Sequence, residues 1–253
     1  MHIMTHRDKL YAQHKLDEHN GSPFVDYFKE IIYGGVDGIV TTFAIVAGFS
    51  GAALSNEATT QLSFAVVLLF GLANLFADSV SMGLGNFLSV KSEQDLYKAA
   101  RAKETHEVRQ NTDLEHEETI TIMLQKGFSE EDAQTLTEIY KKNETYWVDF
   151  MMNHELEMSD PRGDNPTFTG FATALSFVVF GAVPLLPFVF LTSGTAEFVF
   201  ILSSISTLCA LIALGILKWK IIGTAFWRSL FEVVLIGGVA ATVAFGVGSL
   251  FTV

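Results

Sequence analysis

Long apolar segments dominate the hydropathy pattern of this chain. A helix needs about 20 mostly apolar residues to cross the hydrocarbon core of a bilayer. Five segments reach that length, at residues 31–53, 62–90, 168–192, 196–217 and 228–252. None has the continuous polar face that a surface helix of a soluble protein carries. The pattern therefore predicts an all-α membrane protein with five transmembrane helices.

The charged residues are concentrated outside these segments. Residues 91–166 hold 18 acidic and 9 basic residues. They therefore contribute most of the formal net charge of −12 of the whole chain. This acidic surplus argues against nucleic-acid binding, which needs a basic surface, and the single cysteine, Cys209, excludes a disulfide framework. The predicted divisions are an N-terminal arm, helices one and two, an acidic domain, and helices three to five, at 1–30, 31–90, 91–166 and 167–253.

Lysine and arginine in the short loops predict the orientation in the membrane. The loops at 54–61 and 192–195 contain neither residue, whereas the loop at 218–228 contains three and the acidic domain begins with Lys91. We therefore expect the N-terminus, the acidic domain and the 218–228 loop to be cytoplasmic. The first 30 residues contain no apolar signal segment, so no cleaved leader is expected.

Three residues with metal-binding or titratable side chains lie inside the first two predicted spans. Asp37 is about 10 Å deep in the first span at 1.5 Å per residue, Met82 reaches a similar depth in the second, and Asp78 lies one turn deeper. A carboxylate in the membrane needs a partner or a water-filled cavity, and a carboxylate with a thioether suits a divalent transition metal. The three residues predict an ion pathway. A structural hydrogen bond for Asp37 and simple packing for Met82 are the alternatives.

The acidic domain is predicted to form three helices, the first unbroken over residues 92–125, the second capped by Ser129, and the third over Tyr146–Met158. Four glutamates of the first helix fall within about 80° of one another at 100° per residue. These are Glu104, Glu107, Glu115 and Glu118. The third helix adds Met151, Met152 and Glu155, spaced so that their side chains can converge. Such a set would hold Fe²⁺ or Mn²⁺ and release it, whereas the alternative is an acidic face that only meets solvent.

Two sequence segments resemble the vacuolar iron transporters, the VIT family. The stretch DGIVTTFAIVAG, at 37–48, resembles the signature of their first helix, and ADSVSMGLGNFLSVKSE, at 77–93, resembles the end of their second. The segment VPLLP, at 183–187, is similar to part of their third helix. The resemblance covers residues 30–253, and the first two motifs are specific in combination.

The resemblance implies a homodimer of five-helix subunits, each with a cytoplasmic three-helix metal-binding domain inserted between helices two and three. It implies an antiporter, not an enzyme, that exports Fe²⁺ and often Mn²⁺ from the cytosol in exchange for protons, with no permanently bound cofactor. The family's transport aspartate and membrane methionine fall on Asp37 and Met82, and its domain ligands match the glutamates and methionines named above. Some members carry a glutamate where this chain has Asn74, and Asp78 can substitute one turn away. We interpret the chain as a prokaryotic member in the plasma membrane.

Two other functions fit an acidic helical domain. A ferritin-like di-iron oxidase characteristically needs two Glu-x-x-His motifs, and no histidine of this chain follows a glutamate by three residues. A membrane-anchored metal sensor or buffer without transport is the second alternative, and a flux measurement separates it from a transporter. An ATP-driven pump is not indicated, because the chain lacks the G-x-x-x-x-G-K-[ST] loop that binds nucleotide phosphates.

Overall fold

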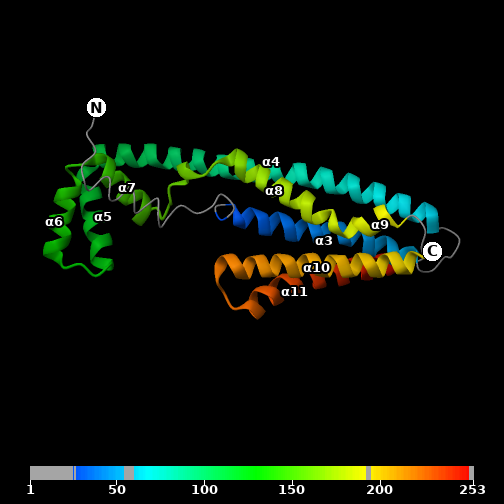
Figure 1. Ribbon diagram of the computed structural model, residues 1–253. Helices are drawn as coiled ribbons and strands as arrows, with labels where there is room; N and C mark the ends of the chain where they lie inside the picture. The colour runs from blue at the N-terminus through cyan, green and yellow to red at the C-terminus, as the bar shows by residue number, and fades with distance from the viewer. Residues whose placement is uncertain (1–24, 26, 54–59, 192–194, 251–253) are drawn as a thin grey trace, which may run out of the picture. The chain divides into compact units, whose positions relative to one another are not determined.

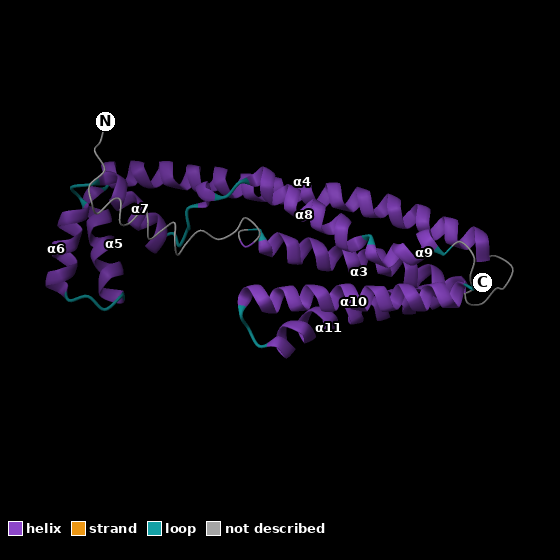
Figure 2. Ribbon diagram, viewed as in Figure 1, coloured by secondary structure: helices purple, strands orange, loops and turns teal. Residues whose placement is uncertain are grey.

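The computed structural model describes residues 25, 27–53, 60–191 and 195–250, and within these ranges every regular element is a helix (Figures 1 and 2). The predicted N-terminal arm lies almost wholly outside the described residues. The elements are α3 (Phe28–Ala53), α4 (Thr60–Gln110), α5 (Thr112–Gln125), α6 (Glu130–Tyr140), α7 (Glu144–His154), η2 (Pro161–Gly163), α8 (Pro166–Gly181), η3 (Val183–Leu185), α9 (Leu186–Phe190), α10 (Ala196–Ile222) and α11 (Phe226–Leu250).

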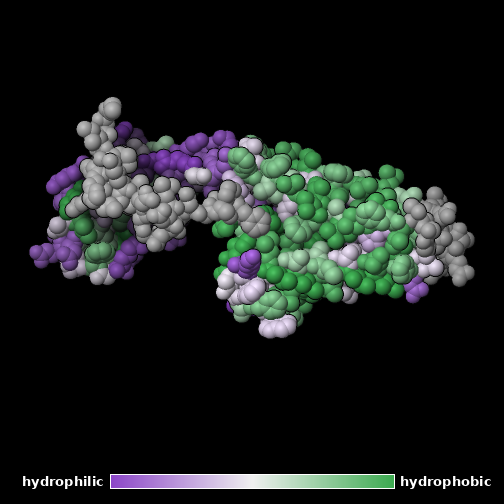
Figure 3. Space-filling view, viewed as in Figure 1, coloured by the Kyte–Doolittle hydropathy of each residue, from purple (hydrophilic) through white to green (hydrophobic). Residues whose placement is uncertain are grey.

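Five helical segments are long and apolar enough to cross a membrane, as the hydropathy pattern predicts. They are Phe28–Ser50, Phe64–Gln110, Pro166–Phe190, Glu197–Ile222 and Phe226–Val247. Large apolar side chains remain exposed along all of them, and apolar residues cover this part of the molecule in Figure 3. Because such surfaces are stable only against lipid or another protein, the prediction of an all-α membrane protein with five spanning helices is confirmed.

The chain divides into two compact units, a membrane unit (residues 1–86 and 167–253) and an acidic unit (residues 87–166). Within the membrane unit, α3 packs against α10 and α11 and approaches α8 very closely. A Cβ atom at Gly38 would lie 2.4 Å from the carbonyl oxygen of Phe177, and one at Gly34 would lie 2.5 Å from that of Thr173. Only glycine therefore allows the two backbones to meet in this way.

The third span breaks near its end, where α8 gives way to η3 and the short helix α9. Pro184 and Pro187 cause the break because a proline ring lacks an N–H group and clashes with the preceding turn. The third span is therefore kinked at these two prolines. The Ser203 hydroxyl on α10 donates a hydrogen bond of 2.7 Å to the Pro184 carbonyl, so this oxygen is satisfied inside the membrane unit.

The expectation of one unbroken helix over residues 92–125 is wrong. Helix α4 ends at Gln110, Asn111 leaves the helical conformation with φ −119° and ψ 37°, and α5 begins at Thr112. The Asn111 carbonyl then accepts hydrogen bonds from the backbone N–H groups of Leu114 and Glu115. Asparagine tolerates this break because its short polar side chain competes with helical hydrogen bonding. The four glutamates expected on one helix face are therefore divided between two helices.

The acidic unit has its own apolar core, although apolar residues are sparse along the sequence of its first helix. Buried residues of α4, α5, α6 and α7 form it: Tyr97, Val108, Ile120, Met123, Ala133, Trp147, Val148, Phe150, Met151 and Met152. The Ser129 cap is confirmed, since its hydroxyl accepts a hydrogen bond from the Asp132 N–H. The expected bounds of the third helix are wrong: α7 begins after the Asn143 cap and ends at His154.

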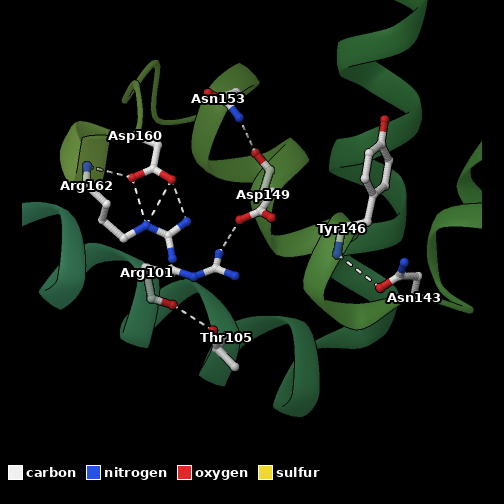
Figure 4. Close-up of polar contacts among 8 residues, drawn as sticks. All are labelled: Arg101, Thr105, Asn143, Tyr146, Asp149, Asn153, Asp160 and Arg162. Atoms are coloured by element: carbon white, nitrogen blue, oxygen red, sulfur yellow. Dashed lines mark hydrogen bonds and ion pairs between the residues drawn. The ribbon is translucent and has the colours of Figure 1, made fainter. Parts of the chain in front are cut away.

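Polar contacts join the elements of the acidic unit around its core (Figure 4). Arg101 on α4 pairs with Asp149 on α7, and Arg162 forms a forked contact with Asp160 in the segment that follows α7. The Gln94 amide donates hydrogen bonds of 3.1 and 2.9 Å to the carbonyl oxygens of Pro161 and Asp164. These contacts hold α7 and the segment after it against α4.

Candidate metal centre and membrane carboxylates

Three carboxylates of the acidic unit converge, each from a different helix. Glu104 lies on α4, Glu115 in the first turn of α5, and Glu155 at the C-terminal cap of α7. One oxygen of each lies within 4.8 Å of the others. Glu104 and Glu115 are only 2% and 3% exposed, whereas Glu155 is exposed. The cluster is therefore buried on two sides and open to solvent at Glu155.

A buried hydrogen-bond network centred on Thr119 connects α5 to α7. The Thr119 hydroxyl lies 2.7 Å from the Glu115 carbonyl oxygen and 3.3 Å from the Met151 sulfur, and it accepts a hydrogen bond of 2.8 Å from the Trp147 indole N–H. The Glu155 N–H in turn bonds to the Met151 carbonyl. Through these contacts, Thr119 positions the turn that carries Glu115 against the helix that carries Glu155.

Burial changes the protonation of this cluster. Desolvation, and after it the negative charges of Glu115 and Glu155, raise the pKa of Glu104 to about 8. Desolvation also raises the pKa of Glu115, to about 7, although the hydrogen bond that it receives from Glu104 lowers it. The pKa of Glu155 is raised by desolvation and then by Glu118. At neutral pH the buried pair therefore shares a proton, because two adjacent carboxylates are not both ionised easily.

Two oxygens of the pair have no partner among the described residues. Glu104 Oε1 and Glu115 Oε2 are fully buried and make no hydrogen bond. A buried acceptor without a partner costs about 1–3 kcal/mol, and more if it is charged, so native structures seldom keep one without a reason. A divalent cation bound at the cluster would provide a partner for buried carboxylate oxygens, which are suitable ligands for it. The donor set therefore fits a divalent metal ion.

The other predicted ligands lie around this cluster in different ways. Glu107 and Glu118 are half-buried and act on the three carboxylates by charge, but they lie outside the group whose oxygens are within 4.8 Å. Met151 and Met152 are fully buried in the apolar core, where the Met151 sulfur contacts Thr119. Sequence reasoning missed Thr119, because a threonine in a helix carries no signal of the partner it will meet.

Each of the two aspartates of the membrane unit has a polar side chain beside it. Asp37 on α3 is half-buried, with the Thr41 hydroxyl 3.5 Å from its carboxylate. The Asn74 amide donates a hydrogen bond of 2.6 Å to Asp78. Met82 is partly buried and packs against an apolar cluster to which α3, α4, α8, α9 and α10 contribute.

The sequence model of the VIT family matches residues 28–249, which include both units. The chain belongs to the VIT family. It is similar to the vacuolar iron transporter of Toxoplasma gondii, with 36% identity over 252 residues that cover 96% of this chain and 79% of that protein. It is also similar to vacuolar iron transporter 2 of Oryza sativa, with 34% identity and 91% of each chain covered.

A third relative of this VIT-family chain is vacuolar iron transporter 1 of Arabidopsis thaliana, 33% identical over 91% of this chain and 89% of that protein. The family resemblance drawn from the two sequence motifs is thus confirmed. All three relatives are eukaryotic proteins whose names refer to the vacuole. The comparisons therefore do not support the interpretation as a prokaryotic protein of the plasma membrane.

Proposed function

We propose that this chain is a divalent metal transporter that moves Fe²⁺, and by the same chemistry Mn²⁺, out of the cytosol in exchange for protons. The observation that carries the proposal is the cluster of Glu104, Glu115 and Glu155, with two buried oxygens that lack a partner, in a chain with five spanning helices. The relatives named as iron transporters support iron as the cargo.

The acidic unit would receive the metal ion on the cytoplasmic side of the membrane. The lysines and arginines of the short loops favour this orientation of the unit. Exposed Glu155 gives an ion access to the buried pair. Binding requires the pair to release its shared proton, because a carboxylate binds metal only when ionised. A cluster of carboxylates without thiolates favours binding that is reversible, and Glu107, Glu118, Met151 and Met152 would surround the ion and tune its affinity.

The membrane unit would carry both ions on Asp37 and Asp78. A carboxylate inside a membrane is costly when it is ionised and unpaired, so each aspartate would hold either a proton or a cation. Metal leaving in one direction and protons entering in the other would then use the same carboxylates in turn, and Met82 would add a soft ligand. Many secondary transporters place their site between two repeats, and a second copy of this chain would supply the other half of the pathway.

Flux into proteoliposomes tests this function directly. The full chain is reconstituted with a pH dye inside, and Fe²⁺, Mn²⁺ or Zn²⁺ is added outside with an acidic lumen. We expect entry of Fe²⁺ and Mn²⁺ that the pH gradient accelerates, with a rise in the luminal pH. Flux that ignores the gradient would indicate a channel. Metal binding without flux would indicate a sensor or buffer, and oxygen consumption with formation of Fe³⁺ would indicate an oxidase.

A further inference from the structure

A contact between an amide and a hydroxyl joins α4 to α8 inside the membrane unit. The Asn86 side chain donates a hydrogen bond of 2.7 Å to the Thr173 hydroxyl, which donates its own hydrogen to the Thr169 carbonyl oxygen at 3.0 Å. Because a hydroxyl has only one hydrogen, Thr173 can only accept from Asn86. The NH₂ group of Asn86 therefore faces α8, and its carbonyl oxygen is left for another partner.

Thr173 is a firm anchor for this contact. Its side chain is fully buried, and its backbone carbonyl oxygen would lie 2.5 Å from a Cβ atom added at Gly34 on α3. Three residues further along α8, the Ser176 hydroxyl donates a hydrogen bond of 2.6 Å to the Ile31 carbonyl oxygen. Helix α8 is thus fixed on α3 at this level, and it holds the Asn86 amide in one orientation.

The carbonyl oxygen of Asn86 is available to a ligand. It has no hydrogen-bond partner in the part of the chain that the structure describes, and the Asn86 side chain is only half-buried. Met82, also half-buried, lies four positions earlier on α4, and side chains at that spacing are neighbours on a helix face. The Asn86 oxygen and the Met82 sulfur can therefore contact the same ion.

Asn86 lies at one end of the row of polar and thioether side chains on α4. Asp78, Met82 and Asn86 follow one another at intervals of four residues, and the membrane unit ends on α4 at Asn86. Lys91, the next charged residue, is about 8 Å further along the helix. An ion that enters the membrane unit from this end of α4 would reach Asn86 before it reaches Met82 and Asp78.

A neutral oxygen suits the first step of entry. Side-chain amide oxygens replace water molecules around divalent cations, and an uncharged ligand binds such an ion less strongly than a carboxylate does, so the ion can move on. We propose that Asn86 is an ion ligand at the entrance of the pathway, where its oxygen and the Met82 thioether together bind a divalent transition metal ion. This inference rests on the proposed transport function, and Thr173 is the positioning residue for Asn86.

Protection of a thiol by Cd²⁺ tests the ligand without a measurement of flux. Asn86→Cys in a Cys209→Ser background is purified as the full chain in detergent and alkylated with N-ethylmaleimide, with and without Cd²⁺. A metal-bound thiolate does not react, so we expect Cd²⁺ to slow alkylation by about tenfold, and Met82→Leu in the same chain to remove most of this protection. The matched control is Leu84→Cys, two positions away on the lipid-exposed side of α4. Equal protection of the two thiols, or no protection of either, would overturn the proposal.

Flux in proteoliposomes separates a ligand from a packing contact. Asn86→Leu and Thr173→Val each remove the same hydrogen bond, but only Asn86→Leu removes the amide oxygen. We expect Asn86→Leu to raise the Mn²⁺ concentration for half-maximal flux by about tenfold, Thr173→Val to raise it less, and Thr173→Ser, which keeps the hydroxyl, to leave it near the native value. Equal changes in Asn86→Leu and Thr173→Val, with equal losses of melting temperature, would show packing alone. Absence of flux in the native chain would contradict the proposed function, and the thiol protection would still decide whether this position binds metal.

Discussion

A carboxylate oxygen of Glu104 lies within 4.8 Å of one of Glu115 across the break between α4 and α5. In one straight helix these residues, eleven positions apart, would be about 16 Å apart along the axis and would not touch. The break at Asn111 changes the direction of the chain, and the two carboxylates then lie close together. The candidate metal centre therefore depends on the point at which the helix is interrupted.

Metal binding should strengthen as pH rises through the range in which this pair ionises. The pKa of Glu104 is raised to about 8 and that of Glu115 to about 7, so at pH 6 the ion must displace protons that are mostly absent at pH 8.5. Calorimetry with Mn²⁺ in two buffers of different ionisation enthalpy should show protons released at pH 7. Glu131 is exposed on α6, so the control variant Glu131→Gln should release as many protons as the native chain. Mn²⁺ binding that does not depend on pH would contradict the assignment of Glu104 and Glu115 as ligands.

The metal-free chain should lose stability over the same range. The folded pKa of Glu104 lies above the unfolded value of 4.5, so the folded state binds more protons between these values, and its stability falls as pH rises through about 8. We expect the melting temperature of the acidic unit, within the full chain, to decrease from pH 5.5 to pH 8.5. In Glu104→Gln, which stays neutral, this decrease should be smaller.

The three converging carboxylates should contribute more to metal affinity than their neighbours. Glu104→Gln or Glu155→Gln removes a charged ligand from the cluster and should weaken Mn²⁺ binding by about tenfold or more. Glu107→Gln and Glu118→Gln, which lie outside the cluster, should weaken it less, because they act only through charge. Replacing Glu104, Glu107, Glu115 and Glu118 together should lower the stoichiometry measured by calorimetry. An unchanged stoichiometry would favour a solvated acidic face.

Metal binding should depend on the hydroxyl group of Thr119 and not on the shape of its side chain. Thr119→Val leaves the buried Trp147 indole N–H without its acceptor, which should cost about 1–3 kcal/mol and weaken metal binding because α5 and α7 lose their link. Thr119→Ser keeps the hydroxyl and should bind metal nearly as well as the native chain. Equal affinity in the two variants, measured by calorimetry, would show that the link does not position the site.

The close contact between α3 and α8 should not accept a methyl group. Gly38→Ala places a Cβ atom 2.4 Å from the Phe177 carbonyl oxygen, and the backbones must separate at a cost of about 1–3 kcal/mol. The matched control is Gly85→Ala on α4, where a Cβ atom meets nothing within 4 Å and the change should be neutral or slightly stabilising. Thermal melts in detergent that fail to distinguish the two variants would contradict this packing.

The two membrane aspartates should have separable roles in flux. Asp37→Asn keeps the side-chain shape but removes the charge, and we expect it to abolish most metal entry into proteoliposomes while the protein stays folded. Asp78→Asn should weaken the dependence of flux on the pH gradient more than it weakens metal binding, because Asn74 leaves no other acid nearby on α4. Glu197→Gln, an exposed acid in the first turn of α10, is the control and should transport normally.

The amino-acid sequence by itself determines the five spanning helices, since each needs a long apolar run that no soluble helix would carry. It also determines the Ser129 cap and the kink at Pro184 and Pro187, because these depend only on neighbouring residues. The acidic character of residues 87–166 is likewise read directly from the sequence. The sequence does not determine which of these acidic side chains lie close together in the folded chain.

Tertiary packing alone decided the composition of the metal centre. Glu155 is 51 positions from Glu104, and it reaches the cluster because α7 packs on α4 and α5 through Trp147, Met151 and the pair Arg101–Asp149. The break at Asn111 is likewise fixed by the packing on both sides of it, since asparagine is tolerated both inside a helix and at its end. A thioether suits an apolar core as well as a metal, so only the fold could show that Met151 and Met152 are buried in the core.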